Sequence, residues 1–196
     1  MRQPIIDFFR TYKGALLFFI SMFAADIVWK LCISGDEQSA TIFFLKRYDW
    51  SEAFAFISTI IAKATYFFTS IFDSSAILRD NIISFPDRKG IMIVWSCSGI
   101  KQMFIFLIIM IFADGRWKNK LWFIPIGLLI CFFINILRTT TLALIIKDHR
   151  DIFPFMHHYV LKYLYYCLIF IIWLLWEERL KNITIRHKSR QQTSTH

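Results

Sequence analysis

Residues 121–146 read LWFIPIGLLICFFINILRTTTLALII, a run in which Arg138 is the only charged side chain. A helix of about 20 such residues crosses a hydrocarbon core about 30 Å thick. The stretch therefore predicts a transmembrane helix. Because a charge inside a membrane is costly, Arg138 is also a candidate functional residue.

The rest of the chain has the composition of an integral membrane protein. Of its 196 residues, 57% are hydrophobic, and phenylalanine alone occurs 22 times. Soluble domains contain about 45–50% apolar residues. This composition excludes a disordered chain, a fibrous protein and an ordinary soluble enzyme, and the length suits one domain.

Three other apolar runs predict spans, at residues 14–33, 97–113 and 159–176. The run 51–72 differs because its polar residues form one stripe at helical spacing; they are Glu52, Thr59, Lys63, Tyr66 and Ser70. A helix facing lipid needs no such stripe, whereas a helix lying in the membrane interface does. We expect an interfacial or re-entrant helix here, with a packed span lining a polar cleft as the alternative.

Residues 82–85 and 91–95 have strand character and flank a turn at 86–90. The expected fold is therefore an all-α integral membrane protein with four transmembrane helices, one interfacial or re-entrant amphipathic helix and a small extracytoplasmic strand-like element. Residues 1–180 are expected to form a single membrane-embedded domain. Residues 181–196 are expected to form a basic cytoplasmic tail without fixed structure at its end.

The net charge of +9 is concentrated in residues 1–13, in the loop 114–120 and in the tail. Positive segments stay on the cytoplasmic side of a membrane, so both termini are predicted to be cytoplasmic. This clustering argues against nucleic acid as a partner. Counting the membrane crossings from the cytoplasmic N-terminus then places residues 34–96 outside the cell membrane, provided that 51–72 does not cross it. A five-span arrangement with the N-terminus outside is the alternative.

Counting residues from the cytoplasmic boundary places Cys97, Arg138 and His158 at a common height of roughly 26 Å. Cysteine thiolate is a nucleophile, histidine can carry a proton, and arginine stays charged in any environment. Cys97 is expected to begin a helix, where the dipole favours a thiolate. Structural roles are the competing interpretation, with Arg138 as a snorkelling anchor and the histidines as a boundary.

The stretch Trp95-Ser96-Cys97-Ser98-Gly99-Ile100 resembles the Cys-Ser-Gly motif of the exosortase/archaeosortase family. Asn135-Ile136-Leu137-Arg138 is similar to the Asn-x-x-Arg motif of that family, and His158 stands where its histidine precedes the final span. The three motifs occur in the family's order, and the length resembles that of compact bacterial members. One departure is Lys162, which occupies a position where many members have glycine.

The resemblance implies a membrane cysteine transpeptidase or protease with Cys97 as the nucleophile. Arg138 would stabilise the thiolate or an oxyanion, and His158 would be the acid/base. The neighbouring His157 is the alternative, since only one of the two adjacent side chains can face Cys97. Supporting or substrate-binding roles fall to Asn135, Ser98, Gly99 and His157.

The resemblance further implies substrates that are exported proteins with a C-terminal sorting signal of the PEP-CTERM type, made of a short motif, a transmembrane helix and a basic tail. The active site would lie at the extracytoplasmic face of the inner membrane. Membrane lipid is a partner, no cofactor or metal is expected, and the acceptor and oligomeric state stay open. The alternative function is a non-enzymatic assembly partner of polysaccharide or secretion machinery, in which Cys97 is dispensable.

Overall fold

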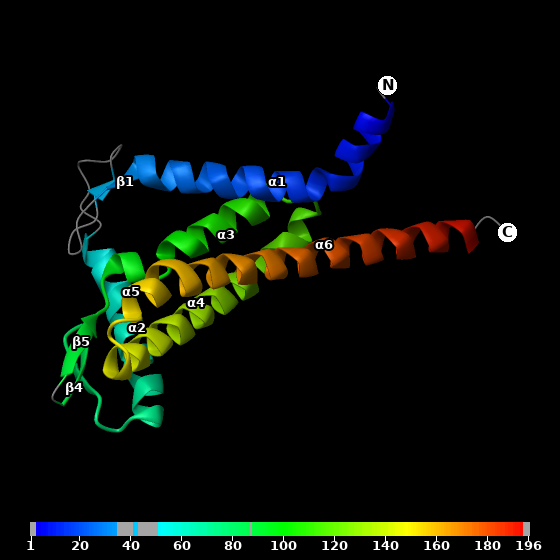
Figure 1. Cartoon of the computed structure of the whole chain (residues 1–196). Helices are drawn as coiled ribbons and strands as arrows, with labels where there is room; N and C mark the ends of the chain where they lie inside the picture. The colour runs from blue at the N-terminus through cyan, green and yellow to red at the C-terminus, as the bar shows by residue number, and fades with distance from the viewer. Residues whose placement is uncertain (1–2, 35–40, 43–50, 87, 194–196) are drawn as a thin grey trace.

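The computed structural model describes the backbone of residues 3–34, 41–42, 51–86 and 88–193, and the side chains of residues 13–33, 52–86 and 90–179 (Figure 1). Its helices are α1 (Gln3–Cys32), α2 (Ser51–Phe72), α3 (Ile100–Phe112), α4 (Trp117–Asp148), the short α5 (Phe153–Phe155) and α6 (Leu161–Thr193). A 3-10 turn, η2 (Trp95–Cys97), precedes α3, and a π-helical turn, η3 (Met156–Val160), joins α5 to α6. The strands are β1 (Ile33–Ser34), β2 (Thr41–Ile42), β3 (Ile77–Arg79), β4 (Ile82–Phe85) and β5 (Arg88–Met92).

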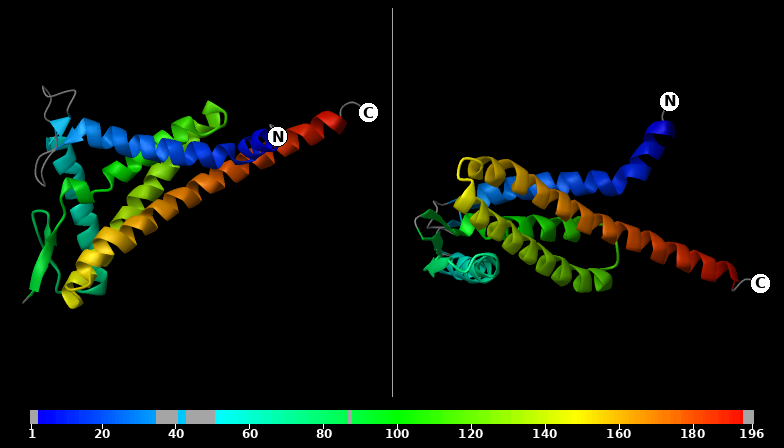
Figure 2. Two further views of the ribbon diagram at one scale, coloured as in Figure 1. Left: turned by 45° about the horizontal axis from the view of Figure 1, so that its top comes forward. Right: turned by 60° about the horizontal axis from the view of Figure 1, so that its bottom comes forward.

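Helices α1, α3, α4 and α6 form a bundle, and the start of α1 and the end of α6 lie at the same end of it (Figures 1 and 2). The bundle core is apolar and aromatic, with Phe106, Ile109, Ile169 and Trp173 all buried. Outside the core the helices expose large apolar side chains, as lipid-facing helices do. Those exposed faces support membrane embedding because water would penalise them.

The turn between α3 and α4 is tied to its neighbours by polar contacts. Lys120 is only 3% exposed, and its Nζ donates to the carbonyl oxygens of Ile111 (2.9 Å) and Ala113 (2.5 Å). It therefore satisfies carbonyls at the C-terminal end of α3 that no helical N–H reaches. Asp114 pairs with Lys13 of α1 at 3.0 Å and accepts the indole N–H of Trp176 on its backbone carbonyl.

Helix α2 runs across the opposite end of the bundle, at a steep angle to α1 and α6 (Figures 1 and 2). The antiparallel sheet β3-β4-β5 lies beside it, and both pack on the last turns of α4 around a second apolar core. Within this core Ile61, Ile83, Ile93 and Ile136 are buried.

The expected all-α membrane architecture is confirmed, with four helices long and apolar enough to cross a membrane and a small three-stranded sheet. The identity of the four differs from the expectation. They cover 13–32, 52–72, 117–148 and 153–179, whereas α3 has 13 residues and is only about 20 Å long. By length α2 qualifies as a span, but its direction across the end of the bundle agrees with an interfacial helix.

Three further expectations need correction. The final strand ends at Met92, and Trp95 belongs to η2, because the chain turns there to enter the site. The turn expected at 86–90 is shorter, since β5 already begins at Arg88 and a third strand, β3, pairs with β4. A tail without fixed structure at its end is expected from the sequence, but α6 continues to Thr193, and residues 194–196 lie outside the described residues.

Candidate active site

Cys97 is the last residue of η2, and α3 begins three residues later at Ile100. Gly99 separates the two elements in a left-handed conformation with φ of +77°, which breaks the helical path. The expectation that Cys97 begins a helix is therefore wrong. Its thiol is half-buried in a bend that enters α3, and it does not occupy the first helical turn.

His157 is the histidine that meets this thiol. The distance between Cys97 Sγ and His157 Nε2 is 3.7 Å. The imidazole stacks on Phe153 with an interplanar angle of 10°, which holds the ring in place. His158 packs edge-on against His157 but is exposed. The preference for His158 as the partner of Cys97 is thus corrected in favour of His157.

The local backbone explains why His157, rather than His158, faces Cys97. Residues 156–160 form a π-helical turn, which is wider than an α-helical turn and shifts the direction of successive side chains. Such turns occur often at functional sites. No sequence pattern in Met-His-His-Tyr-Val distinguishes this turn from an ordinary helix start, so the orientation of the two rings could not be deduced from spacing.

Asn135 connects α4 to the segment that carries the thiol. It is fully buried, and its Nδ2 donates to the backbone carbonyl of Cys97 at 3.1 Å. A Cβ at Gly99 would lie 2.7 Å from Asn135 Cγ, so the absence of a side chain at residue 99 permits this approach. Behind it, Thr139 donates to the carbonyl of Asn135 at 3.0 Å and contacts Thr65 of α2 at 2.7 Å.

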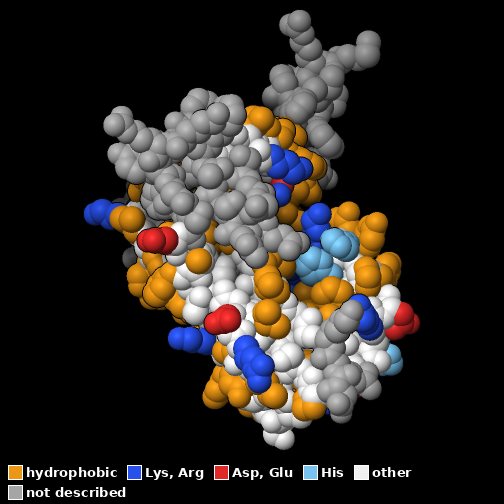
Figure 3. All heavy atoms as spheres, turned by 90° about the vertical axis from the view of Figure 1, so that its left-hand side faces the viewer, with side chains coloured by type: hydrophobic (Ala, Val, Ile, Leu, Met, Phe, Trp, Pro, Cys, Tyr) orange, Lys and Arg blue, Asp and Glu red, His pale blue; other side chains and the backbone are white. Residues whose placement is uncertain are grey.

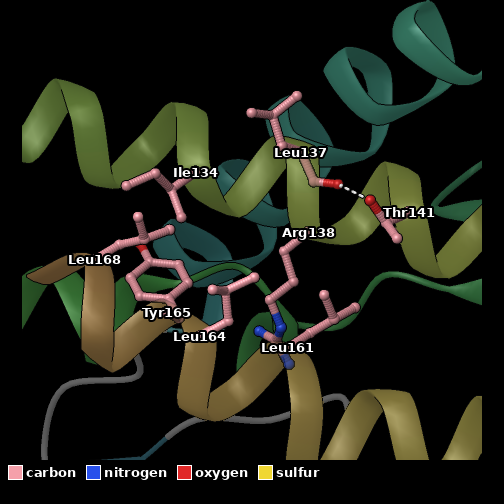
Figure 4. Close-up of a pocket in the computed structure, with 8 residues that line it drawn as sticks. All are labelled: Ile134, Leu137, Arg138, Thr141, Leu161, Leu164, Tyr165 and Leu168. Carbon is pink, nitrogen blue, oxygen red and sulfur yellow. Dashed lines mark hydrogen bonds between the residues drawn. The ribbon is translucent and has the colours of Figure 1, made fainter.

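Arg138 lies one turn after Asn135 on the same side of α4. Its side chain enters a cavity of about 180 Å³ between α4 and α6, where the guanidinium points toward Leu161 and Leu164 (Figure 4). Its Nε is buried and has no hydrogen-bond partner among the described residues. Arg138 also acts electrostatically on His157. The structure thus offers a guanidinium that has unused hydrogen-bonding capacity and acts electrostatically on the imidazole of the thiol–imidazole pair.

The other candidate residue, Ser98, makes contacts that stabilise the local fold. Ser98 is fully buried, and its hydroxyl donates to the carbonyl of Trp95, which closes the turn that carries Cys97. All four cysteines are free thiols, and Cys131 is buried in the bundle core. Within the side chains that the structure describes, no group of three or more His, Cys, Asp or Glu could hold a metal ion.

The site lies at the end of the bundle where α2 and the sheet gather, away from the start of α1 and the end of α6 (Figure 1). Figure 3 faces this end, and the pale-blue histidine side chains are visible at its surface between hydrophobic and basic neighbours. Cys97 and His157 are both half-buried. The pair is therefore accessible from this end of the molecule.

Comparison with known proteins gives one match. The family model described as transmembrane exosortase (Exosortase_EpsH) matches residues 41–175. The matched range covers more than half of the chain and contains Cys97, Asn135, Arg138, His157 and His158. No curated protein and no solved structure matches the chain.

Proposed function

The chain belongs to the transmembrane exosortase family, and on this premise we propose that it is a cysteine transpeptidase that cleaves C-terminal sorting signals of exported proteins. The observation that supports the proposal most directly is the 3.7 Å approach of Cys97 Sγ and His157 Nε2. A thiol beside an imidazole is the arrangement that activates a cysteine nucleophile. Family membership by itself supports a membrane protein of the sorting-enzyme family. The thiol mechanism is what we propose beyond it.

In the proposed reaction, His157 Nε2 accepts the thiol proton and the Cys97 sulfur attacks the carbonyl carbon of the scissile peptide bond. The tetrahedral intermediate collapses when the leaving amine takes the proton from His157. A thioester to Cys97 remains. An amine acceptor or water then attacks the thioester, His157 removes the proton of this nucleophile, and the thiol is restored.

Arg138 is the proposed electrostatic residue. Its Nε is buried without a partner among the described residues, so it can donate a hydrogen bond to a group that enters with the substrate. A guanidinium stays charged in an apolar site and stabilises the negative charge of an oxyanion or thiolate. Asn135 is a positioning residue because it holds the Cys97 carbonyl.

The membrane itself contributes to this reaction. A substrate anchored by its own helix is confined to the bilayer, so its scissile bond meets the site at a high effective concentration. Because α3 is only about 20 Å long, Cys97 lies below the outer edge of a hydrocarbon core about 30 Å thick. Helix α2 and the sheet lie at this end of the bundle, and their proposed role is to limit the access of water, which favours an amine acceptor over hydrolysis.

The proposed location is the inner membrane, with both termini cytoplasmic and the site at the extracytoplasmic face. The support is that α1 begins and α6 ends at the same end of the bundle, opposite the site. The basic start of α1, from residue 3, and the basic loop 114–120 lie at that end as well, as the positive-inside rule requires.

The experiment is co-expression with an exported protein that carries a C-terminal helix and a basic tail. Its processed fraction is compared between the wild type, Cys97→Ala and Cys167→Ala at matched membrane levels. Cys167 provides the control because its thiol is exposed on α6, away from the site. We expect processing to disappear only with Cys97→Ala, and hydroxylamine to release a thioester-linked product from the wild type. Equal processing by both variants would reject Cys97 as the nucleophile, and the absence of processing by the wild type would favour the non-enzymatic assembly role.

A further inference from the structure

A second cavity, of about 340 Å³, lies between α1, α3 and α6. Its lining residues are Met22, Phe23, Asp26, Lys30, Lys101, Ile105, Lys162, Tyr163 and Tyr166. It is distinct from the cavity of Arg138, with which it shares no lining residue. The proposed thiol chemistry uses none of these side chains.

The cavity carries an excess of positive charge. Three lysines and one aspartate line it, which gives a formal net charge of +2. Asp26 pairs with Lys30 and with Lys101, at 2.7 Å in each case, so one carboxylate is shared by two ammonium groups. Lys162 forms no ion pair with any described residue, and its side chain is exposed. Such an arrangement attracts an anion.

The polar and apolar residues of the cavity are separated along the helix direction. On α1, Lys30 lies eight residues after Met22, which corresponds to about 12 Å along the axis. On α3, Lys101 lies one turn closer to the site than Ile105. The charges therefore gather near the site end, whereas Met22, Phe23 and Ile105 line the deeper part. Figure 3 shows basic side chains around an acidic one close to the histidines at this end.

This separation matches an amphiphile rather than a soluble anion. The headgroup of a membrane lipid would lie among the lysines, and its acyl chain would follow the apolar side chains toward the middle of the bundle. Phe23 and Tyr163 are 62% and 61% exposed at the edge of the cavity, where an acyl chain would cover them. A cavity whose edge faces lipid is also open to lateral entry from the bilayer.

We infer that this cavity binds the phosphate-bearing headgroup of a membrane phospholipid, held by Lys30, Lys101 and Lys162 with its acyl chain against α1 and α3. The phosphate would share the two ammonium groups now bridged by Asp26 and would supply Lys162 with a counter-charge. The binding site adjoins the catalytic end, since Lys101 follows Cys97 by four residues. The inference does not depend on the thiol chemistry.

The test uses the purified, delipidated full chain in a neutral detergent, titrated with phosphatidylglycerol and followed by native mass spectrometry. Three other probes separate the sources of binding: diacylglycerol with the same acyl chains, sn-glycerol 3-phosphate, and inorganic phosphate. We expect saturable binding of one phosphatidylglycerol, at least tenfold tighter than that of diacylglycerol, with neither soluble phosphate competing at comparable concentrations.

Lys162→Gln tests the cavity itself, and Lys63→Gln is its matched control. Lys63 is an exposed lysine on α2 outside the cavity, so its substitution makes the same change in charge without altering the site. Loss of one lysine is expected to weaken phosphatidylglycerol binding about fivefold for Lys162→Gln, and not for Lys63→Gln. Equal affinities in the two variants, or equal binding of diacylglycerol, would overturn the proposal. Competition by glycerol 3-phosphate at equal concentration would show a soluble phosphate site instead.

Discussion

The side-chain amide of Asn135 donates a hydrogen bond to the backbone carbonyl of Cys97 at 3.1 Å, across 38 residues of sequence. The same side chain packs against Gly99, so it contacts the bend that carries the thiol at two points. Since Asn135 is completely buried, neither contact competes with water. The placement of the nucleophile thus depends on α4 as much as on its own turn.

Replacement of this amide by a carboxylate should damage the site with little change in volume. Asn135→Asp removes the donor and sets a buried acceptor against the Cys97 carbonyl. We expect the processing rate to fall at least tenfold and the free energy of unfolding to fall by about 1–3 kcal/mol. Both quantities should stay near wild-type values in Asn119→Asp, because Asn119 is exposed at the opposite end of the bundle. A fully active Asn135→Asp enzyme would refute the positioning role.

Gly99 should tolerate no side chain. Its φ of +77° is strained for any residue with a Cβ, and that Cβ would lie 2.7 Å from Asn135 Cγ. We expect Gly99→Ala to lower the melting temperature and to abolish processing. Gly14→Ala is the control, since the new methyl group would meet side chains and no backbone: the end of the flexible Glu177 side chain at 3.0 Å and Trp173 Cζ2 at 3.4 Å. Similar melting temperatures for the two variants would show that the bend at residue 99 is not constrained.

The two adjacent histidines should differ in their effect on catalysis. General acid/base catalysis contributes about 10²–10⁴-fold, so His157→Gln should reduce processing by that order. His158→Gln removes the same chemical group from an exposed position and should change the rate less than threefold. The measurement is the processed fraction over time at matched membrane levels. The opposite ranking would assign the proton transfer to His158.

Lys120 should stabilise the fold without acting in catalysis. Lys120→Met keeps the aliphatic length but leaves the carbonyls of Ile111 and Ala113 without this donor. Loss of a charged donor to buried carbonyls costs about 1–3 kcal/mol, which a denaturant titration in detergent can measure. Lys118→Met, at an exposed position of the same helix, should cost little. An unchanged unfolding midpoint in Lys120→Met would contradict the structural role.

Asp73 should make the stability depend on acid pH. The side-chain contact with Lys147, together with the hydroxyl and backbone N–H of Ser75, lowers the pKa of Asp73 from 3.8 to about 2. Because the folded pKa is lower than the unfolded one, its stabilisation is fully present above about pH 4. It is lost as the pH falls toward 2.

Melting temperatures between pH 5 and pH 2 test this dependence. Over this range the melting temperature of the wild type should fall further than that of Asp73→Asn. Asp80→Asn is the matched control, since Asp80 is an exposed turn residue with no ion pair among the described residues. Parallel curves for the wild type and Asp73→Asn would show that the pair contributes nothing to folding.

Much of the site could be predicted from sequence because depth in a membrane follows from counting. Residues 97 and 157–158 stand at the starts of apolar runs, and residue 138 lies 17 residues into another, so their approach to a common height follows from helical rise. Asp26 and Lys30 stand four residues apart on one helix, a spacing that brings side chains together, and they pair at 2.7 Å. The second partner of Asp26 is Lys101, which lies on another helix and could not be inferred from that spacing.

The amino-acid sequence by itself determined that the chain is a helical membrane protein, because hydropathy and length are sums over neighbouring residues. It also determined which residue types meet at one end of the bundle. Only the tertiary structure decided that α3 begins at Ile100, that α2 crosses the end of the bundle, and that His157 faces Cys97. The physical reason is that side-chain direction depends on backbone geometry, here the left-handed Gly99 and the π-helical turn at 156–160. At Gly99 that geometry is fitted to Asn135, a residue distant in sequence.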